Sequence, residues 1–423
     1  MKTLQRLLTG GLLLSALCAA APHTQALVPE RREGDGSQEF GWLMLPTPIH
    51  VEGIGQAVGV FGILSNVLQS VDVVGGQTLP GGDIEFSFLH IKEIPLFTPH
   101  LLVSGTRFRG KAPVPSYARG IDSHKDDFIQ TLSLYDGYDY RVNLRLWEER
   151  LNLFYQGQDA TATTLKVYDN QGTLLSSAET TQSYEGTLYG AFFDFTDDAS
   201  DPRKGLRFGR KVRPLQSRYD FISDTRTTDT SATAYVPMFG NDTLVLNVFR
   251  STSTITRAGV TDEATARQIL DQGCVVGSPT YQECVDSENQ RVAEFLAYNR
   301  HGMAMPLGGT NRLRAYPMNR FTAGNACFQA VEYRLNFSDK PKKFNYYLLG
   351  GVRTLLQMAF FHERGTVNDD VSQLGTRMRT STGLGLRALI SGVVYRLDVA
   401  RGNEGTAVNL FFDYPLQFNP LLE

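Results

Sequence analysis

Beyond its first residues, the 423-residue sequence lacks long apolar runs. After residue 26, no segment approaches the roughly 18 consecutive apolar residues of a membrane-spanning helix. The chain has 4 cysteines and 7 histidines without HExxH or another paired-ligand spacing, so we expect no metal and no cofactor. No histidine stands beside a recognisable nucleophile, so we expect the protein to have no enzymatic activity. No Pro/Gly/Ser-rich linker or charge block divides the chain, which disfavours several soluble domains.

Residues 1–26 have the pattern of a secretory signal peptide. Lys2 and Arg6 precede an apolar stretch from Leu7 to Ala20, and small residues surround Ala26. Cleavage after Ala26 leaves 397 residues (423 − 26), with 39 basic (41 − 2) and 44 acidic side chains, a net charge of −5. This balance argues against nucleic acid as a partner.

Export permits disulfides, and three cysteines remain after the predicted cleavage. Cys274 and Cys284 lie in one polar stretch, residues 272–289, where a disulfide would add about 2–3 kcal/mol by closing a short loop. Two free thiols are the alternative. Cys327 is then left over, and we expect it to be a small packed side chain.

Many segments alternate between apolar and polar residues, which indicates β-strands. In residues 328–337, Glu332 and Arg334 share one face while Val331 and Tyr333 share the other. Residues 378–388 and 393–400 repeat this division. Several segments reach the ~9–11 residues that a tilted strand needs to cross a membrane, which favours a transmembrane antiparallel β-barrel. A secreted β-sandwich or β-helix remains the alternative.

The last alternating segment predicts that Val408, Leu410, Phe412 and Tyr414 share one face, opposite Asn409 and Asp413. The sequence contains 18 Tyr and 25 Phe, which suits a lipid-facing wall with aromatic girdles. Earlier strands are predicted at residues 49–64, 82–94, 101–110, 138–147, 151–158, 163–169, 189–196, 206–212, 233–238 and 244–253. Residues 261–291 fit a helical extracellular loop better than a strand. We therefore divide the mature chain into a short periplasmic segment, residues 27–48, and an all-β barrel domain, residues 49–423.

The segment from Leu307 to Tyr316 resembles a hallmark of the bacterial surface antigen family, the superfamily of BamA, TamA and the translocators of two-partner secretion. Members close a barrel of about sixteen strands and fold a long extracellular loop into the lumen. Its tip carries V-R-G-F/Y, which we match to Leu313, Arg314, Ala315 and Tyr316. Ala315 stands where the family has glycine, so it adds strain if that position requires a positive φ.

A second family motif, F-x-D-x-G, resembles residues 361–365, where Phe361, Glu363 and Gly365 match and glutamate replaces aspartate. The resemblance implies that Glu363 accepts a forked pair of hydrogen bonds from Arg314. Without the resemblance, Arg314 would be read as a solvated loop cation. Residues 194–205 and 383–400 also resemble family segments.

The resemblance implies a barrel of the bacterial outer membrane that assists insertion or transport of polypeptide or lipid. Its partners would be outer-membrane lipid and unfolded outer-membrane or secreted polypeptides. Family members usually place POTRA domains before the barrel, and residues 27–48 are too few for one. A passive pore or a structural surface barrel is the main alternative, and a soluble exported β protein is the third.

Overall fold

A computed structural model describes Pro29 and residues 40–67, 71–199, 201–271, 273–277, 281–337, 342–346, 349–390, 393–412 and 414–416. The predicted signal peptide, residues 1–26, lies outside the described residues. Residues 27–28 and 30–39 of the predicted periplasmic segment also lie outside them.

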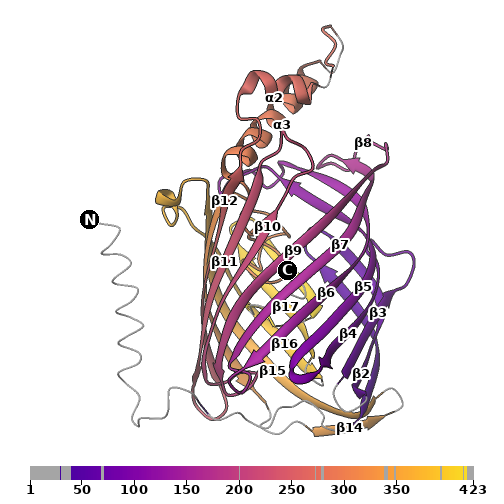
Figure 1. The fold of residues 1–423 in the computed structure, drawn as a ribbon, viewed down its shortest axis with the longest axis vertical. Helices are drawn as coiled ribbons and strands as arrows, with labels where there is room; N and C mark the ends of the chain where they lie inside the picture. Colours follow the sequence, from indigo (N-terminus) through magenta and orange to yellow (C-terminus); the bar gives the residue numbers. More distant parts are fainter. Residues whose placement is uncertain are drawn as a thin grey trace.

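The described strands form one antiparallel sheet of 18 strands that closes into a barrel (Figure 1). Strands β8 and β14 are short additions to β7 and β15, which leaves 16 (18 − 2) in the wall. The predicted all-β class and sixteen-stranded antiparallel barrel are confirmed. The strands are β1 (Gly41–Val51), β2 (Gly55–Val67), β3 (Val71–Thr78), β4 (Glu85–Leu96), β5 (Thr98–Tyr117), β6 (Phe128–Leu146), β7 (Leu151–Tyr168), β8 (Leu174–Ser176), β9 (Thr180–Thr196), β10 (Gly205–Leu215), β11 (Asp224–Pro237), β12 (Thr243–Arg257), β13 (Asn325–Asn336), β14 (Lys342–Tyr346), β15 (Leu349–Asn368), β16 (Arg379–Ile390), β17 (Val393–Gly402) and β18 (Gly405–Phe412).

The two faces of the wall differ as the alternation predicts. On β13, Val331 is 46% exposed on the outer face, whereas Glu332 is fully buried on the inner face. Leu384 and Leu386 on β16 are likewise exposed, and Arg387, which follows Leu386, is buried. Apolar side chains thus cover the outside and charged ones point inward, as in barrels that face lipid. Within the described residues, no helix is both long and apolar enough to cross a membrane.

The first strand begins earlier than predicted. β1 starts at Gly41, so the barrel begins before residue 49, and the segment predicted as one strand, 49–64, contains the turn between β1 and β2. The sequence pattern did not predict this strand because it contains Pro46 and Pro48, and proline is rare inside sheets. The strand predicted at 163–169 is also wrong as a separate element: it is the second half of β7.

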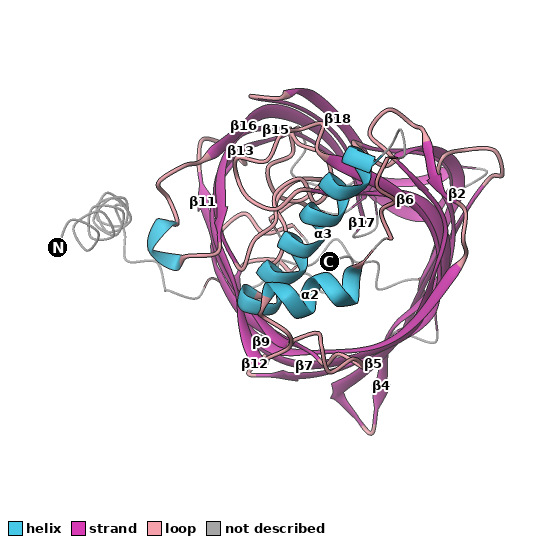
Figure 2. Ribbon diagram, turned by 90° about the horizontal axis from the view of Figure 1, so that it is seen from above, coloured by secondary structure: helices cyan, strands magenta, loops and turns pink. Residues whose placement is uncertain are grey.

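Two helices stand at one end of the barrel, here called the helix end (Figure 1). They are α2 (Glu263–Leu270) and α3 (Tyr281–His301), and they cross the mouth of the barrel in Figure 2. Asp262 caps α2 by accepting a hydrogen bond from the backbone N–H of Thr265 at 2.8 Å. Because α3 ends at His301, the helical region extends ten residues beyond the predicted limit of residue 291.

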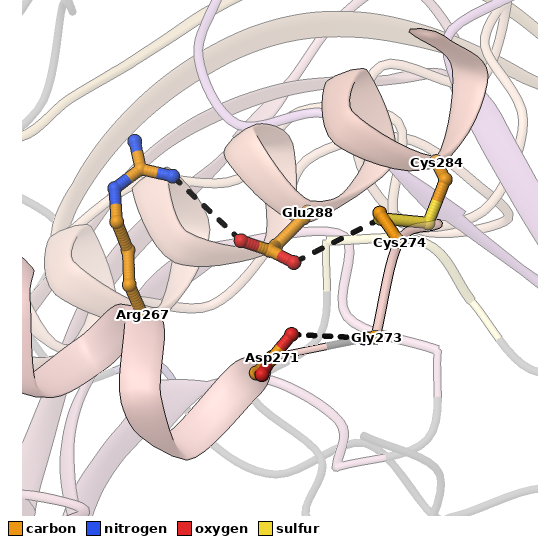
Figure 3. Close-up of a disulfide and its surroundings, with 6 residues drawn as sticks. All are labelled: Arg267, Asp271, Gly273, Cys274, Cys284 and Glu288. Atoms are coloured by element: carbon orange, nitrogen blue, oxygen red, sulfur yellow. Dashed lines mark hydrogen bonds and ion pairs between the residues drawn. A yellow bond between two sulfur atoms is a disulfide. The ribbon is translucent and has the colours of Figure 1, made fainter. Parts of the chain in front are cut away.

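A disulfide joins Cys274 to Cys284, with 5.8 Å between their Cα atoms (Figure 3). Glu288 on α3 lies between its sulfur atoms and α2: one carboxylate oxygen is 4.0 Å from Cys274 Sγ, and the other is 3.9 Å from Arg267. The disulfide joins the segment between the two helices to the first turn of α3. Cys327 is a free, partly buried thiol on β13.

Candidate functional site in the barrel lumen

After α3 the chain folds back into the lumen before it enters β13. Leu307, Leu313, Tyr316 and Phe321 of this inserted loop, residues 303–324, are all fully buried. Its tight turn depends on glycine: Gly308 has a φ of 111°, and a Cβ there would lie 2.3 Å from the carbonyl oxygen of Pro317. The loop segments gather on the side of the lumen nearest β13, β15 and β16 (Figure 2).

The loop tip places Arg314 against Glu363 of β15. The Nε of Arg314 donates to one oxygen of Glu363 at 2.8 Å, and the backbone N–H of Arg314 donates to the other at 2.8 Å. Glu363 thus accepts a pair of hydrogen bonds from Arg314, as predicted, although one of the two comes from the backbone and not from the guanidinium. The remaining guanidinium nitrogens donate to Glu332 at 3.1 Å and to Asp398 at 3.2 Å, because three carboxylates surround this cation.

Further arginines complete a buried charge cluster. Glu332 accepts from both terminal nitrogens of Arg387, at 2.8 and 2.6 Å, and from Arg334 at 2.8 Å. Asp398 accepts from Arg396. Four guanidinium groups thus meet three carboxylates, as buried charges must be paired to be tolerated. Burial alone would lower the pKa of Arg314, but the carboxylates, Glu363 foremost, outweigh it and raise that pKa.

The other motif residues shape this contact. The ring of Phe361 lies beneath the Arg314 guanidinium, 3.4 Å from ring centre to carbon. A Cβ on Gly365 would lie 2.8 Å from a methyl of Leu307, so glycine makes room for the loop. The backbone N–H of Ala315 donates to Ser381 Oγ at 3.0 Å. The tip residue with a positive φ is Leu313, at 53°, and not Ala315, so the strain expected at position 315 is absent.

Sequence reasoning missed Glu332, Arg387 and Asp398 as members of this site. Their inward positions on alternating strands were the available signal. This signal could not show that Glu332, Glu363 and Asp398, on three different strands, meet one cation of the inserted loop. The tip's last residue, Tyr316, is also buried, and its hydroxyl donates to the carbonyl of Thr380 at 3.1 Å.

The seam between β1 and the C-terminal strands carries few ladder pairs. β1 pairs with β2 along its whole length, from Gly41↔Ser65 to Val51↔Gly55. On its other edge, the described pairs are one with β18, at His50, and two with the start of β15, at Trp42 and Leu43. Between residues 43 and 50, the described strands form no ladder pair across the seam.

Two prolines explain this weak edge. The Tyr395 hydroxyl donates to the carbonyl oxygen of Pro48 at 2.6 Å, so the backbone of Pro48 faces the seam. Alternate residues of a strand turn their backbone groups to the same side, so Pro46 faces the seam as well. Neither nitrogen carries a hydrogen, and this edge therefore lacks two donors.

Beyond β18 the chain enters the lumen. The ring of Phe412 stacks on Phe61, at 4.9 Å between centroids, within a cluster of inward-facing side chains of β1 and β2. Beyond it, Tyr414 is buried in the lumen, and its hydroxyl donates to Asp201 at 2.9 Å. The prediction that Tyr414 shares a face with Val408 is wrong, because alternation assigns faces only within a strand and β18 ends at Phe412, which still pairs with Tyr395.

No protein-family model and no curated protein sequence matches this chain. Among solved structures, CdiB from Escherichia coli superposes with a TM-score of 0.50 and 10% identity, over 88% of this chain and 62% of that chain. The chain shares the barrel fold of CdiB. BamA from Haemophilus ducreyi lacking POTRA domains 1–3 superposes with a TM-score of 0.46 and 10% identity, over 90% of this chain and 70% of that chain. CdiB from Acinetobacter baumannii superposes with a TM-score of 0.46 and 10% identity, over 88% of this chain and 59% of that chain. At this identity the likeness concerns the fold alone.

In this CdiB-like barrel, two arginines fasten loops over the helix end of the lumen. Arg320 of the inserted loop donates to Glu404 at 2.9 and 2.8 Å and to Ser123 at 2.8 Å. Arg119 donates to Asp369 at 3.1 and 3.0 Å. Burial would raise the pKa of Asp369, but the hydrogen bond from Arg119 lowers it overall. The described residues contain no group of three or more His, Cys, Asp or Glu arranged to hold a metal ion.

Proposed function

We propose that this chain is a barrel of the bacterial outer membrane, exported by a cleaved signal peptide, that assists insertion or transport of polypeptide or lipid through its seam. The helix end would be extracellular, and the end where β1 begins would be periplasmic. The proposal assigns the chain no catalytic role. The shared barrel fold and the predicted signal peptide support the location.

The weak seam carries this proposal. A barrel normally has no free strand edges, because every wall strand pairs on both sides. Here β1 has one described ladder pair with β18, at His50↔Leu410, and two prolines on the same edge. Separating β1 from β18 therefore breaks few backbone hydrogen bonds.

The packing of the lumen disfavours the passive pore. The loop tip from Leu313 to Tyr316 is almost fully buried, and Arg314 is fixed by three carboxylates. Tyr414 adds a buried ring at the other side of the charge cluster, 4.3 Å from Arg334. A route through the seam avoids dismantling this cluster, whereas a wide central channel requires it.

Planar-bilayer conductance with a seam lock tests the proposal. The lock is His50→Cys with Leu410→Cys, in a Cys327→Ser background. The matched control is Val399→Cys with Val408→Cys, which pairs β17 with β18 and leaves the seam free. Both variants receive the same oxidant and reductant, so effects on the native disulfide cancel.

We expect the parent protein to be mostly closed with brief openings. The oxidised lock should suppress these openings, reductant should restore them, and the control pair should have no effect. A stable channel of one fixed conductance that ignores the lock would refute the proposal and support the passive pore.

A further inference from the structure

The inner wall of β1 and β2 beside the seam is apolar, unlike the charged wall of β13 to β17 on the other side of the seam. Leu43, Phe61 and Ile63 are buried there, and Leu45, Val74, Phe88 and Phe412 pack against them. We call these residues the seam patch. Ladder pairing puts Leu45, Phe61, Gly76 and Phe88 in one row across β1 to β4. Such a group of apolar side chains is unusual on this face, because the interior of these barrels is usually polar.

Aromatic rings connect the patch to the outside of the barrel. Tyr395 points outward at the seam, opposite in face to the buried Arg396, and its ring lies 5.3 Å from that of Phe412. Phe412 stacks on Phe61 at 4.9 Å, and Phe61 lies 6.3 Å from Phe88. These are ordinary contact distances for aromatic pairs. The rings therefore form a continuous apolar path from the lipid-facing surface into the lumen.

The inner end of this path is open. Phe86 shares the inner face with Phe88, 5.5 Å away, and remains 39% exposed. A Cβ on Gly110 would lie 2.6 Å from the Phe86 ring, so the glycine seats this ring flat on β5. The ring of Phe412 covers Phe61. Phe86, which lies beyond Phe88, is only partly covered by the described residues.

The edge of β1 favours a hydrocarbon chain over a polypeptide strand as occupant. A strand added to this edge would meet Pro46 and Pro48, which have no N–H, and two of its own carbonyls would lose their partners. An acyl chain needs no hydrogen bonds and gains from contact with apolar side chains. The exposed leucine and valine side chains on the outer face of β2, including Val58, already place lipid beside the seam.

We infer that the seam patch, together with Phe86, binds an acyl chain of a membrane phospholipid that enters between β1 and β18. This inference rests on the proposed function, because the seam must open for the acyl chain to enter. It narrows the proposed cargo from polypeptide or lipid to lipid alone.

Tryptophan quenching by phosphatidylcholine brominated on its acyl chains tests the inference. The chain has 2 tryptophans, Trp42 and Trp147, and both are first replaced by phenylalanine. Phe86→Trp then reports on the patch, and Phe88→Trp is the second reporter if the first does not fold. Phe192→Trp is the matched control, an inward-facing aromatic position on β9. Val58→Trp marks full exposure to lipid.

In vesicles without added polypeptide, we expect Phe86→Trp to lose most of the fluorescence that Val58→Trp loses, while Phe192→Trp keeps its fluorescence. Closing the seam with His50→Cys and Leu410→Cys before reconstitution should abolish the loss at position 86. Equal quenching at positions 86 and 192 would overturn the inference. So would quenching that requires an added unfolded polypeptide, which would assign the patch to a client strand. If the conductance assay shows seam opening but position 86 is not quenched, the proposed function stands and the inference alone fails.

Discussion

Replacing Arg314 with alanine removes the cation that three buried carboxylates share, and we expect a large loss of barrel stability. The guanidinium donates to Glu363, Glu332 and Asp398 at 2.8, 3.1 and 3.2 Å, and all four side chains are fully buried. A hydrogen bond to a charged group contributes about 1.5–3 kcal/mol, so simple addition would give roughly 5–9 kcal/mol.

The real loss will be smaller, because Glu332 and Asp398 keep other arginine partners and contacts within one network do not add. Removing one partner of a buried ion pair costs about 3–5 kcal/mol, which is the range we expect.

Urea unfolding of the refolded barrel in detergent micelles, followed by tryptophan fluorescence, measures this loss. The control is Arg364→Ala, which removes an arginine from the outer face of β15, next to Glu363, where it donates to Gln329 at 2.7 Å. This exposed site should change stability by less than about 1 kcal/mol. Arg314→Lys should recover only part of the loss, because an ammonium group cannot reproduce a planar fork of donors. Equal values for Arg314→Ala and Arg364→Ala would refute the role given to the buried cluster.

Four further predictions concern other parts of the chain. Replacing Cys274 and Cys284 with serine should cost the helix pair about 2–3 kcal/mol and speed its proteolysis, while the heat-shift gel of the barrel stays unchanged. Tyr414→Phe should lower the free energy of unfolding in urea by about 1 kcal/mol through loss of one buried hydrogen bond. Ala315→Gly should not stabilise the barrel in the same assay, because this position has no positive φ to relieve. Asp369→Asn should lower the heat-shift temperature at pH 7. Because the folded pKa of Asp369 is depressed below 3.8, its contribution is present above that pH and lost as the pH falls through the folded value, so variant and parent should converge in acid.

Much of the barrel could be predicted because alternation is a local property. The faces of β13 follow from the order of Val331, Glu332, Tyr333 and Arg334, since successive side chains of a strand point to opposite sides. The same rule failed at Pro46 and Pro48, which interrupt the apolar pattern of a real strand. It also failed at Tyr414, which lies beyond the end of β18 and is buried in the lumen.

The sequence by itself determined that this chain forms long strands with one apolar face, a helical excursion that holds Cys274 and Cys284, and a loop tip carrying Arg314. Only the tertiary structure decided that this arginine is shared by three acids and that the wall is weakest beside β1. The physical reason is distance along the chain: Glu332, Glu363 and Asp398 lie on different strands, and their meeting depends on register and curvature summed around the whole barrel. The seam depends likewise on how far the first and last strands overlap, which no local pattern specifies.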